Sequence, residues 1–123
     1  MARVLVVDDY EGFRLAMEFC LPTFGHSVVV RSTGELTPQL LAQIQTDILV
    51  VGVSPASLNG FVICEWMGAG PQLRAIPFIV LANPLTPAIE ARAKALGAAA
   101  VLAKPFDWPE LLRVIGVASR ASA

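Results

Sequence analysis

The sequence predicts an α/β fold built on a parallel sheet, and three observations lead to this prediction. Five short runs rich in Val, Ile and Leu recur along the chain, at Val4–Val7, Val28–Val30, Ile48–Val53, Phe78–Ala82 and Val101–Ala103. Longer segments with the apolar spacing of helices separate these runs. The runs are almost continuously apolar, as strands are when helices cover both faces of a parallel sheet. Alternating strands and helices joined by right-handed crossovers give this three-layer arrangement.

The composition fits one domain of this kind, spanning residues 1–123. A chain of 123 residues of which 55% are hydrophobic can fill one core. The mean hydropathy of +0.64 is high, but no apolar run approaches the roughly 18 consecutive residues of a membrane helix. The N-terminus has no basic segment ahead of an apolar one, which predicts no signal peptide and a cytoplasmic location. The net charge of −1 offers no basic patch for nucleic acid.

The helices are predicted from apolar spacing and from their end signals. The first helix covers Glu11–Leu21, with a buried face formed by Phe13, Ala16, Met17 and Cys20. Thr37-Pro38 and Thr86-Pro87 each combine an N-cap residue with Pro at the first helical position. Asp107 to Glu110 resembles a capping box that opens the last helix. The core face of that helix is formed by Leu111, Val114, Ile115 and Ala118.

The two cysteines and the single histidine carry no recognisable motif. Cys20 and Cys64 both fall in predicted helices, where we expect small buried hydrophobic residues in a reducing compartment rather than a disulfide. His26 follows a turn glycine and is expected at the surface.

Charged residues follow the predicted strands at their carboxyl ends. Asp8 and Asp9 come after the first strand, and Lys104 comes after the fifth. In an open parallel sheet these ends meet at one edge, where ligands bind. Carboxylate oxygens at such an edge suit Mg²⁺, which takes one or two carboxylates together with water and phosphate oxygens. A lysine there would pair with a phosphoryl group or with the carboxylates.

These residues belong to a wider pattern that covers essentially the whole chain. The pattern consists of Val6-Val7-Asp8-Asp9, Arg14, Asp47, Asn59-Gly60, Pro77, Gly97-Ala98 and Lys104-Pro105-Phe106. Together these motifs resemble the receiver domains of two-component response regulators, the CheY-like family. The resemblance implies a flavodoxin-like, doubly wound sheet of five parallel strands in the order 2-1-3-4-5.

The resemblance also implies a phosphorylation switch. In this family a histidine kinase phosphorylates an aspartate at the end of the third strand, beside an aspartate pair that holds Mg²⁺. A Ser or Thr after the fourth strand and a lysine after the fifth hold the phosphoryl group, and an aromatic residue on the fifth strand rotates inward. At the matching positions this chain has Asp8 and Asp9 for the metal pair and Lys104 for the lysine.

Three other positions of the switch depart from the family pattern. Gly52 stands at the phosphate-acceptor position, Ala82 at the Ser/Thr position and Val101 at the aromatic position. The loop proline, Pro55, also comes one residue earlier than in the family. These departures identify a degenerate receiver, or pseudo-receiver, with no catalytic residue.

The loss of the third carboxylate leaves two carboxylates against one lysine. We therefore expect Lys104, the remnant of the phosphate site, to lie directly on Asp8 or Asp9. A charge-assisted contact of this kind contributes about 1.5–3 kcal/mol if partly buried, and it would hold one conformation without a metal. Mg²⁺ binding at Asp8 and Asp9 is expected to be weak or vestigial because one ligand is lost.

No other residue replaces the acceptor without difficulty. Asp47 begins the third strand, and five residues at about 3.3 Å each place it about 16 Å from Gly52. Ser54 lies near the site, but a hydroxyl cannot form the acyl phosphate that this chemistry uses. Phosphorylation of Asp8 or Asp9 stays open as an alternative.

The function that we expect is a non-enzymatic, receiver-like signalling module that acts by protein–protein interaction without phosphorylation. One alternative keeps the chain in a working phosphorelay, through Asp8 or Asp9 or through phosphate bound non-covalently at Lys104. Another alternative is a flavodoxin-like cofactor binder, which would need a phosphate-binding loop rich in Gly, Ser and Thr after the first strand. The acidic segment Asp8-Asp9-Tyr10-Glu11 would repel phosphate and disfavours that alternative.

A partner protein or a second copy of the chain would need an exposed contact surface. The family resemblance indicates the face formed by the helix that follows Thr86, the strand Val101–Ala103 and the last helix. Trp108 opens that last helix and is one interface candidate, because exposed Trp is enriched at binding hot spots. A Trp packed at the start of the helix explains this residue equally well. Leu15 and Phe19 lie on a different stripe of the first helix from its core face and form a second candidate patch.

Overall fold

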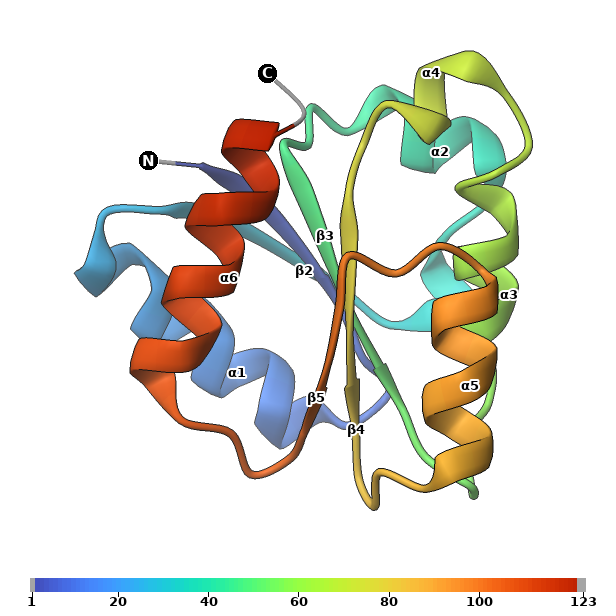
Figure 1. Ribbon diagram of the computed structural model, residues 1–123. Helices are drawn as coiled ribbons and strands as arrows, with labels where there is room; N and C mark the ends of the chain where they lie inside the picture. Colours follow the sequence, from blue (N-terminus) through green and yellow to red (C-terminus); the bar gives the residue numbers. More distant parts are fainter. Residues whose placement is uncertain (1, 122–123) are drawn as a thin grey trace.

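The computed structural model describes residues 2–121 and contains the predicted sheet (Figure 1). All five strands are parallel, in the predicted order β2-β1-β3-β4-β5. The strands are β1 (Arg3–Val7), β2 (Ser27–Arg31), β3 (Ile48–Val53), β4 (Phe78–Ala82) and β5 (Ala100–Ala103). Every residue of β4 and five of the six residues of β3 are buried, as continuously apolar central strands require.

Helices cover both faces of the sheet (Figure 1). The longer ones are α1 (Glu11–Cys20), α2 (Pro38–Gln43), α3 (Gly60–Trp66), α5 (Pro87–Ala95) and α6 (Trp108–Ala121). The short ones are α4 (Pro71–Arg74) and the 3-10 helices η1 (Leu21–Phe24) and η2 (Thr33–Glu35). The face that the family resemblance indicated for a partner is therefore made by α5, β5 and α6.

Two apolar cores lie on opposite faces of the sheet. One core packs β-strand side chains against α2, α3 and α5, around Leu41, Phe61 and Ile89. The other packs them against α1 and α6, around Met17 and Leu111. None of the helices in residues 2–121 is long and apolar enough to cross a membrane.

The predicted helix starts at Thr37 and Thr86 are confirmed. The Thr37 hydroxyl accepts a hydrogen bond from the Leu40 N–H at 3.1 Å, and the Thr86 hydroxyl accepts one from the Ile89 N–H at 3.2 Å. The complete capping box within residues 2–121 belongs instead to Ser32 and Glu35 in η2.

Three sequence predictions about single residues are corrected by the structure. Ala16 is exposed, because the core face of α1 runs through Phe13 and Met17 only. Cys20 is half-buried, whereas Cys64 is fully buried and burial raises the pKa of its thiol to about 12. His26 is half-buried rather than at the surface, and its Nδ1 accepts a hydrogen bond from the Ala2 N–H at 3.0 Å.

The strand register brings the candidate site together at one edge of the sheet. Val7 pairs with Val51 in β3, and Val53 pairs with Ala82, which pairs in turn with Ala103. The residues that follow β1 and β5, together with Gly52 near the end of β3, therefore lie side by side.

Candidate functional site

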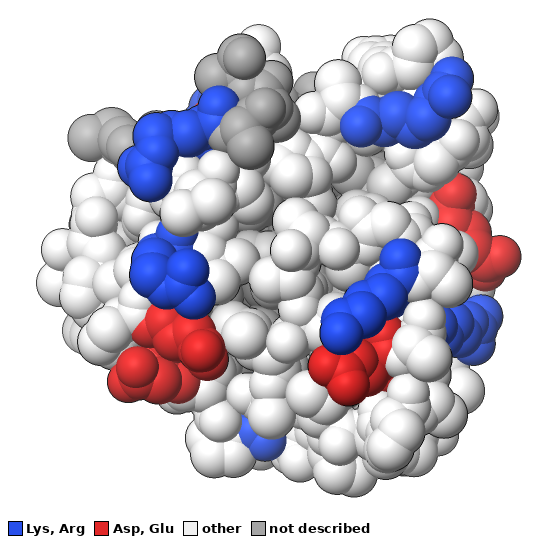
Figure 2. All heavy atoms as spheres, viewed as in Figure 1, with Lys and Arg blue, Asp and Glu red and all other residues white. Residues whose placement is uncertain are grey.

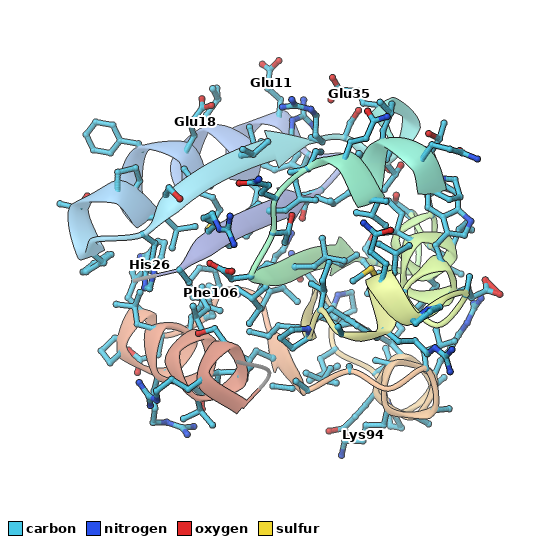
Figure 3. The ribbon with its side chains drawn as sticks, turned by 90° about the horizontal axis from the view of Figure 1, so that it is seen from above. Glu11, Glu18, His26, Glu35, Lys94 and Phe106 are labelled. Atoms are coloured by element: carbon cyan, nitrogen blue, oxygen red, sulfur yellow. The ribbon has the colours of Figure 1, made fainter. Side chains whose placement is uncertain are left out.

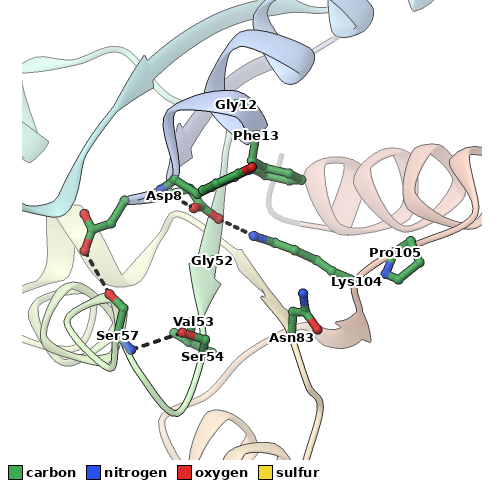
Figure 4. Close-up of a pocket in the computed structure, with 12 residues that line it drawn as sticks. Asp8, Gly12, Phe13, Gly52, Val53, Ser54, Ser57, Asn83, Lys104 and Pro105 are labelled. Carbon is green, nitrogen blue, oxygen red and sulfur yellow. Dashed lines mark hydrogen bonds and ion pairs between the residues drawn. The ribbon is translucent and has the colours of Figure 1, made fainter.

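A pocket of about 700 Å³ lies at the carboxyl edge of the sheet (Figure 4). It is lined by Asp8, Asp9, Tyr10, Gly12, Phe13, Gly52, Val53, Ser54, Ser57, Asn83, Lys104 and Pro105. All three charged residues expected at this edge, Asp8, Asp9 and Lys104, are thus in one pocket.

Asp8 and Lys104 form a buried ion pair on the pocket floor. Lys104 Nζ lies 2.5 Å from Asp8 Oδ2, and the other carboxylate oxygen accepts the Tyr10 N–H at 2.8 Å. The ammonium also lies 3.9 Å from the centroid of the Phe13 ring, in cation–π geometry. The predicted contact of Lys104 with one of the two aspartates is confirmed, and the partner is Asp8.

Gly52 faces this ion pair directly. A Cβ built on Gly52 would lie 1.7 Å from Asp8 Oδ2 and 3.2 Å from Lys104 Nζ. The first of these distances is far below van der Waals contact, so any side chain at position 52 requires the Asp8 carboxylate to move. The Asp8 carboxylate, directly after β1, therefore occupies the space that a side chain at Gly52 of β3 would fill.

Asp9 points away from this pair and connects its own loop after β1 with η2 and with the loop after β3 through hydrogen bonds. Its carboxylate accepts hydrogen bonds from the Thr33 N–H at 2.8 Å, the Thr33 hydroxyl at 2.7 Å and the Ser57 hydroxyl at 2.9 Å. Burial acts to raise the pKa of Asp9, but donors including Thr33, Ser57 and Asn59 outweigh it and hold that pKa below its ordinary value. Asp9 is thereby fixed as a carboxylate between η2 and the loop after β3.

The loop after β3 is itself folded back. Ser54 and Ser57 exchange backbone hydrogen bonds at 3.0 Å, and the Ser57 N–H also donates to the Ser54 hydroxyl. This tight turn contains the early proline at position 55, and the Ser57 hydroxyl at its end donates to Asp9.

The residues at the remaining family positions are aliphatic and packed. Ala82 is completely buried at the end of β4. Val101 is half-buried in β5 and packs against the core shared with α2, α3 and α5. Asp47 lies at the opposite end of β3, where its carboxylate forms an ion pair with Arg3 at 2.9 Å.

The donor set for a metal is divided between two places. Within residues 2–121, no group of three or more His, Cys, Asp or Glu side chains is arranged to hold a metal ion. A divalent ion at Asp8 would have to replace the Lys104 ammonium, and one at Asp9 would have to replace its bonds from Thr33 and Ser57. Asp8 and Asp9 have the oxygen chemistry that suits Mg²⁺, but each already has partners within the protein.

The interface candidates differ in exposure. Leu15 and Phe19 are exposed as expected, with 57% and 82% of their surfaces accessible. Trp108 is half-buried, and its ring centroid lies 4.9 Å from that of Phe106 and 5.5 Å from that of Phe24. Trp108 therefore packs on the side of α1 and η1, rather than presenting a free side chain on the face that includes α5.

Sequence reasoning did not single out Thr33, Ser57 or Phe13 as parts of the site. Thr33 follows β2 closely, as Asp8 follows β1, so its place after a strand was a usable signal. Ser57 and Phe13 reach the pocket through the shape of a loop and the rotation of a helix, which the sequence pattern does not specify.

Comparison with known proteins agrees with this arrangement. A family model described as the response regulator receiver domain matches residues 4–116. The chain belongs to this family. Receiver domains are modules of response regulator signalling that work with protein partners, and the five-stranded CheY-like fold is the one observed here.

Individual relatives share between a quarter and a third of the sequence. Protein PilH of Pseudomonas aeruginosa is 29% identical over 115 residues, covering 94% of this chain and 95% of that protein. The transcriptional regulatory protein GltR of the same species is 30% identical over 109 residues, covering 89% of this chain but 45% of that protein. The crystallised chemotaxis protein CheY4 of Vibrio cholerae superposes with a TM-score of 0.83 at 25% identity, covering 96% of this chain and 98% of that one. The chain thus spans nearly all of some relatives and less than half of others.

Proposed function

We propose that this chain is a pseudo-receiver, a single signalling domain that acts by protein–protein interaction and is not switched by phosphorylation. The observation that supports this is the position of the Asp8 carboxylate, which fills the space beside Gly52. Gly52 matches the phosphate-acceptor position of the family, so the chain has no carboxylate there and no room for one in this conformation.

The rest of the pocket supports the same proposal. Ala82 and Val101, at the positions of the family's hydroxyl and aromatic residues, are packed aliphatic side chains. Neither has a group that could bind a phosphoryl oxygen or report its arrival by a hydrogen bond.

Lys104 supplies the positive charge that balances Asp8 in the pocket. Its ammonium lies directly against Asp8 and neutralises the one buried carboxylate of the pocket. Because a buried charge without a partner is costly, this ion pair stabilises one conformation with no need for a bound cation. We infer that Mg²⁺ binds weakly and is not required for the fold or for partner binding.

The partner surface that the structure favours is the outer side of α1. Leu15 and Phe19 are separated by one helical turn and are both exposed, which places a small apolar patch on that side. Glu11 and Glu18 are exposed on the same helix, and Figure 3 shows both side chains projecting outward from it. An apolar pair bordered by carboxylates suits a partner segment whose apolar residues are bordered by Lys or Arg.

The face formed by α5, β5 and α6 is the second surface to test, also for a homodimer. In Figure 2, charged side chains surround an uncharged central area of this view. On α5, Glu90 and Lys94 form an exposed ion pair.

The deciding experiment is intact-mass spectrometry after incubation with acetyl phosphate and Mg²⁺. We expect no added mass on the natural chain. The Gly52→Asp, Ala82→Thr double variant is the matched positive control, since it returns the two missing side chains to the same pocket. A hydroxylamine-labile phosphoryl adduct on the natural chain would overturn the proposal, and Asp8→Asn and Asp9→Asn would then show which aspartate carries it.

Partner binding is tested separately from phosphorylation. Leu15→Asp and Phe19→Asp are expected to abolish capture of the partner, or self-association in sedimentation velocity, without changing the fold. Val62→Asp on α3 is the control, because Val62 is also an exposed apolar residue, on the other face of the sheet. Unchanged binding in both α1 variants would move the contact to the face of α5, β5 and α6.

A further inference from the structure

Four aromatic rings form a continuous column that begins in the pocket and ends at the surface between α6 and η1. Phe13 and Phe106 pack edge to face with ring centroids 6.1 Å apart, and Phe106 and Trp108 pack edge to face at 4.9 Å. Trp108 and Phe24 follow at 5.5 Å. These separations are those of favourable aromatic pairs.

The first ring of the column, Phe13, contacts the ion pair through the Lys104 ammonium. The Lys104 ammonium lies between the Asp8 carboxylate, at 2.5 Å, and the Phe13 ring centroid, at 3.9 Å. An ammonium over a ring face is attracted by the ring quadrupole, so Phe13 is held in part by the position of Lys104. Any event that moves the Asp8 carboxylate changes the position of this ammonium and with it the charge that Phe13 faces.

A second connection runs along the chain. Lys104 and Phe106 are separated by one residue, in the loop that leads from β5 to α6. Phe106 and Trp108 both pack against the core shared with α1. A displacement of Lys104 therefore reaches Phe106 through the backbone as well as through the Phe13 ring, and close packing passes it on to Trp108.

The last ring reaches the surface. Phe24 closes η1 and is 48% exposed. The column thus joins the pocket to the side of the domain where α1, η1 and α6 meet.

We propose that the state of the Asp8–Lys104 pair is transmitted through Phe13, Phe106 and Trp108 to Phe24, so that the pocket controls the α1–α6 side of the domain. This route does not use β4 or the α5 side of β5, where Ala82 and Val101 are packed aliphatic residues. It is independent of how the pair is displaced, whether by a ligand, by a metal ion or by covalent modification.

The test uses the two tryptophans of the chain as reporters in ¹⁵N NMR spectra of the whole protein. Gly52→Ala displaces Asp8, because the added Cβ would lie 1.7 Å from Oδ2, and its three nearest neighbours are atoms of Asp8 and Lys104. We expect the Trp108 indole N–H resonance to shift and the Trp66 resonance on α3 to stay in place. Gly34→Ala is the matched control, since a Cβ there meets nothing within 4 Å, and it should move neither resonance.

A second arm tests the route itself. In a Phe13→Leu background, Gly52→Ala should shift the Trp108 resonance much less, because only the backbone connection from Lys104 to Phe106 remains. The proposal is overturned if Trp108 does not respond to Gly52→Ala, or if it responds equally with and without the Phe13 ring. If dispersed amide signals are lost in Gly52→Ala, Asp8→Asn replaces it in both arms and the same two results decide the question.

Discussion

The Asp8 carboxylate lies in the space that a side chain on Gly52 would fill, since a Cβ on Gly52 would lie 1.7 Å from the Asp8 oxygen Oδ2. The reason for glycine here is this close approach rather than the backbone, because positive φ angles within residues 2–121 occur at Gly25 and Gly97 only. The absence of a side chain at Gly52 and the ion pair between Asp8, after β1, and Lys104, after β5, therefore depend on each other.

Restoring the two missing side chains is expected to restore Mg²⁺ binding. In Gly52→Asp, Ala82→Thr the Asp8 carboxylate has to leave its present position. It then lies in the open pocket beside the new carboxylate at position 52. Mg²⁺ should then raise the melting temperature, because a ligand that binds only the folded state stabilises it. The natural chain should show a much smaller change at the same Mg²⁺ concentration.

The cost of the restoration is also predictable. Without Mg²⁺, Gly52→Asp should lower the free energy of unfolding by about 1–3 kcal/mol, the usual cost of overpacking, and Gly52→Ala should show part of that loss. If Mg²⁺ leaves the melting temperature of the double variant unchanged, the backbone of the pocket, and not only its side chains, is unsuited to the metal.

Removing Lys104 is expected to be strongly destabilising. The side chains of Lys104 and Asp8 are only 16% and 6% exposed, so Lys104→Met leaves a buried carboxylate without its partner. Breaking a buried pair in this way costs about 3–5 kcal/mol. Urea unfolding of Lys104→Met, Asp8→Asn and the double variant measures this loss.

The double variant and a surface pair provide the controls. The double variant Asp8→Asn, Lys104→Met should be more stable than the sum of the two single losses predicts. It leaves no unpaired charge, whereas each single variant leaves one. Lys94→Met removes the exposed partner of Glu90 and should change stability by only about 0.2–1 kcal/mol. Additive losses at Asp8 and Lys104 would show that the ion pair is not the source of the stability.

The sequence was sufficient for the fold and for much of the pocket, because both follow from strand order. Strand runs and helix starts were readable from residue type, and the strand ends identified Asp8, Asp9 and Lys104 as neighbours. The sequence could not show that Asp8 lies in the space beside Gly52, since that depends on a side-chain rotamer and on the register of β1 against β3.

Two side-chain positions could not be predicted from helical spacing. Ala16 fits the helical spacing but lies at the edge of the buried stripe, where a small side chain is tolerated in water. Trp108 packs with Phe106 and with Phe24, and Phe24 belongs to another segment of the chain. Contacts between distant segments of this kind leave no periodic signal in the sequence.

Asp9 should make the domain less stable in acid. Its pKa is held below the unfolded value of about 3.9, so the unfolded chain binds more protons than the folded one in this range. The stabilisation is complete above pH of about 4 and is lost as pH falls through the folded pKa. Urea unfolding between neutral and acidic pH should show a smaller acid loss in Asp9→Asn than in the natural chain. Equal losses would mean that Thr33 and Ser57 do not stabilise the charged form.

His26 should titrate below its ordinary pKa. Burial lowers the pKa of this imidazole, and its Nδ1 must be unprotonated to accept the Ala2 N–H. Since the folded pKa is below the unfolded value of about 6.5, its contribution to stability is full above that pH and is lost as pH falls through the folded pKa. The ring proton shifts of this single histidine measure the pKa directly by NMR. A midpoint at or above 6.5 would contradict the hydrogen bond to Ala2.

Phe19 on α1 should matter for partner binding but not for stability, whereas Trp108 at the start of α6 should matter for stability. Phe19 is 82% exposed, so Phe19→Ala is expected to change the free energy of unfolding by less than about 0.5 kcal/mol, as surface substitutions do. Trp108 packs between Phe106 and Phe24, and Trp108→Ala should lose about 2–4 kcal/mol, somewhat below the cost at a fully buried site. Urea unfolding of both variants tests this, with partner capture measured on the same samples under conditions where each is folded. A stable Trp108→Ala variant that fails to bind would show that Trp108 is a contact residue, and the patch of Leu15 and Phe19 would then no longer be the favoured interface.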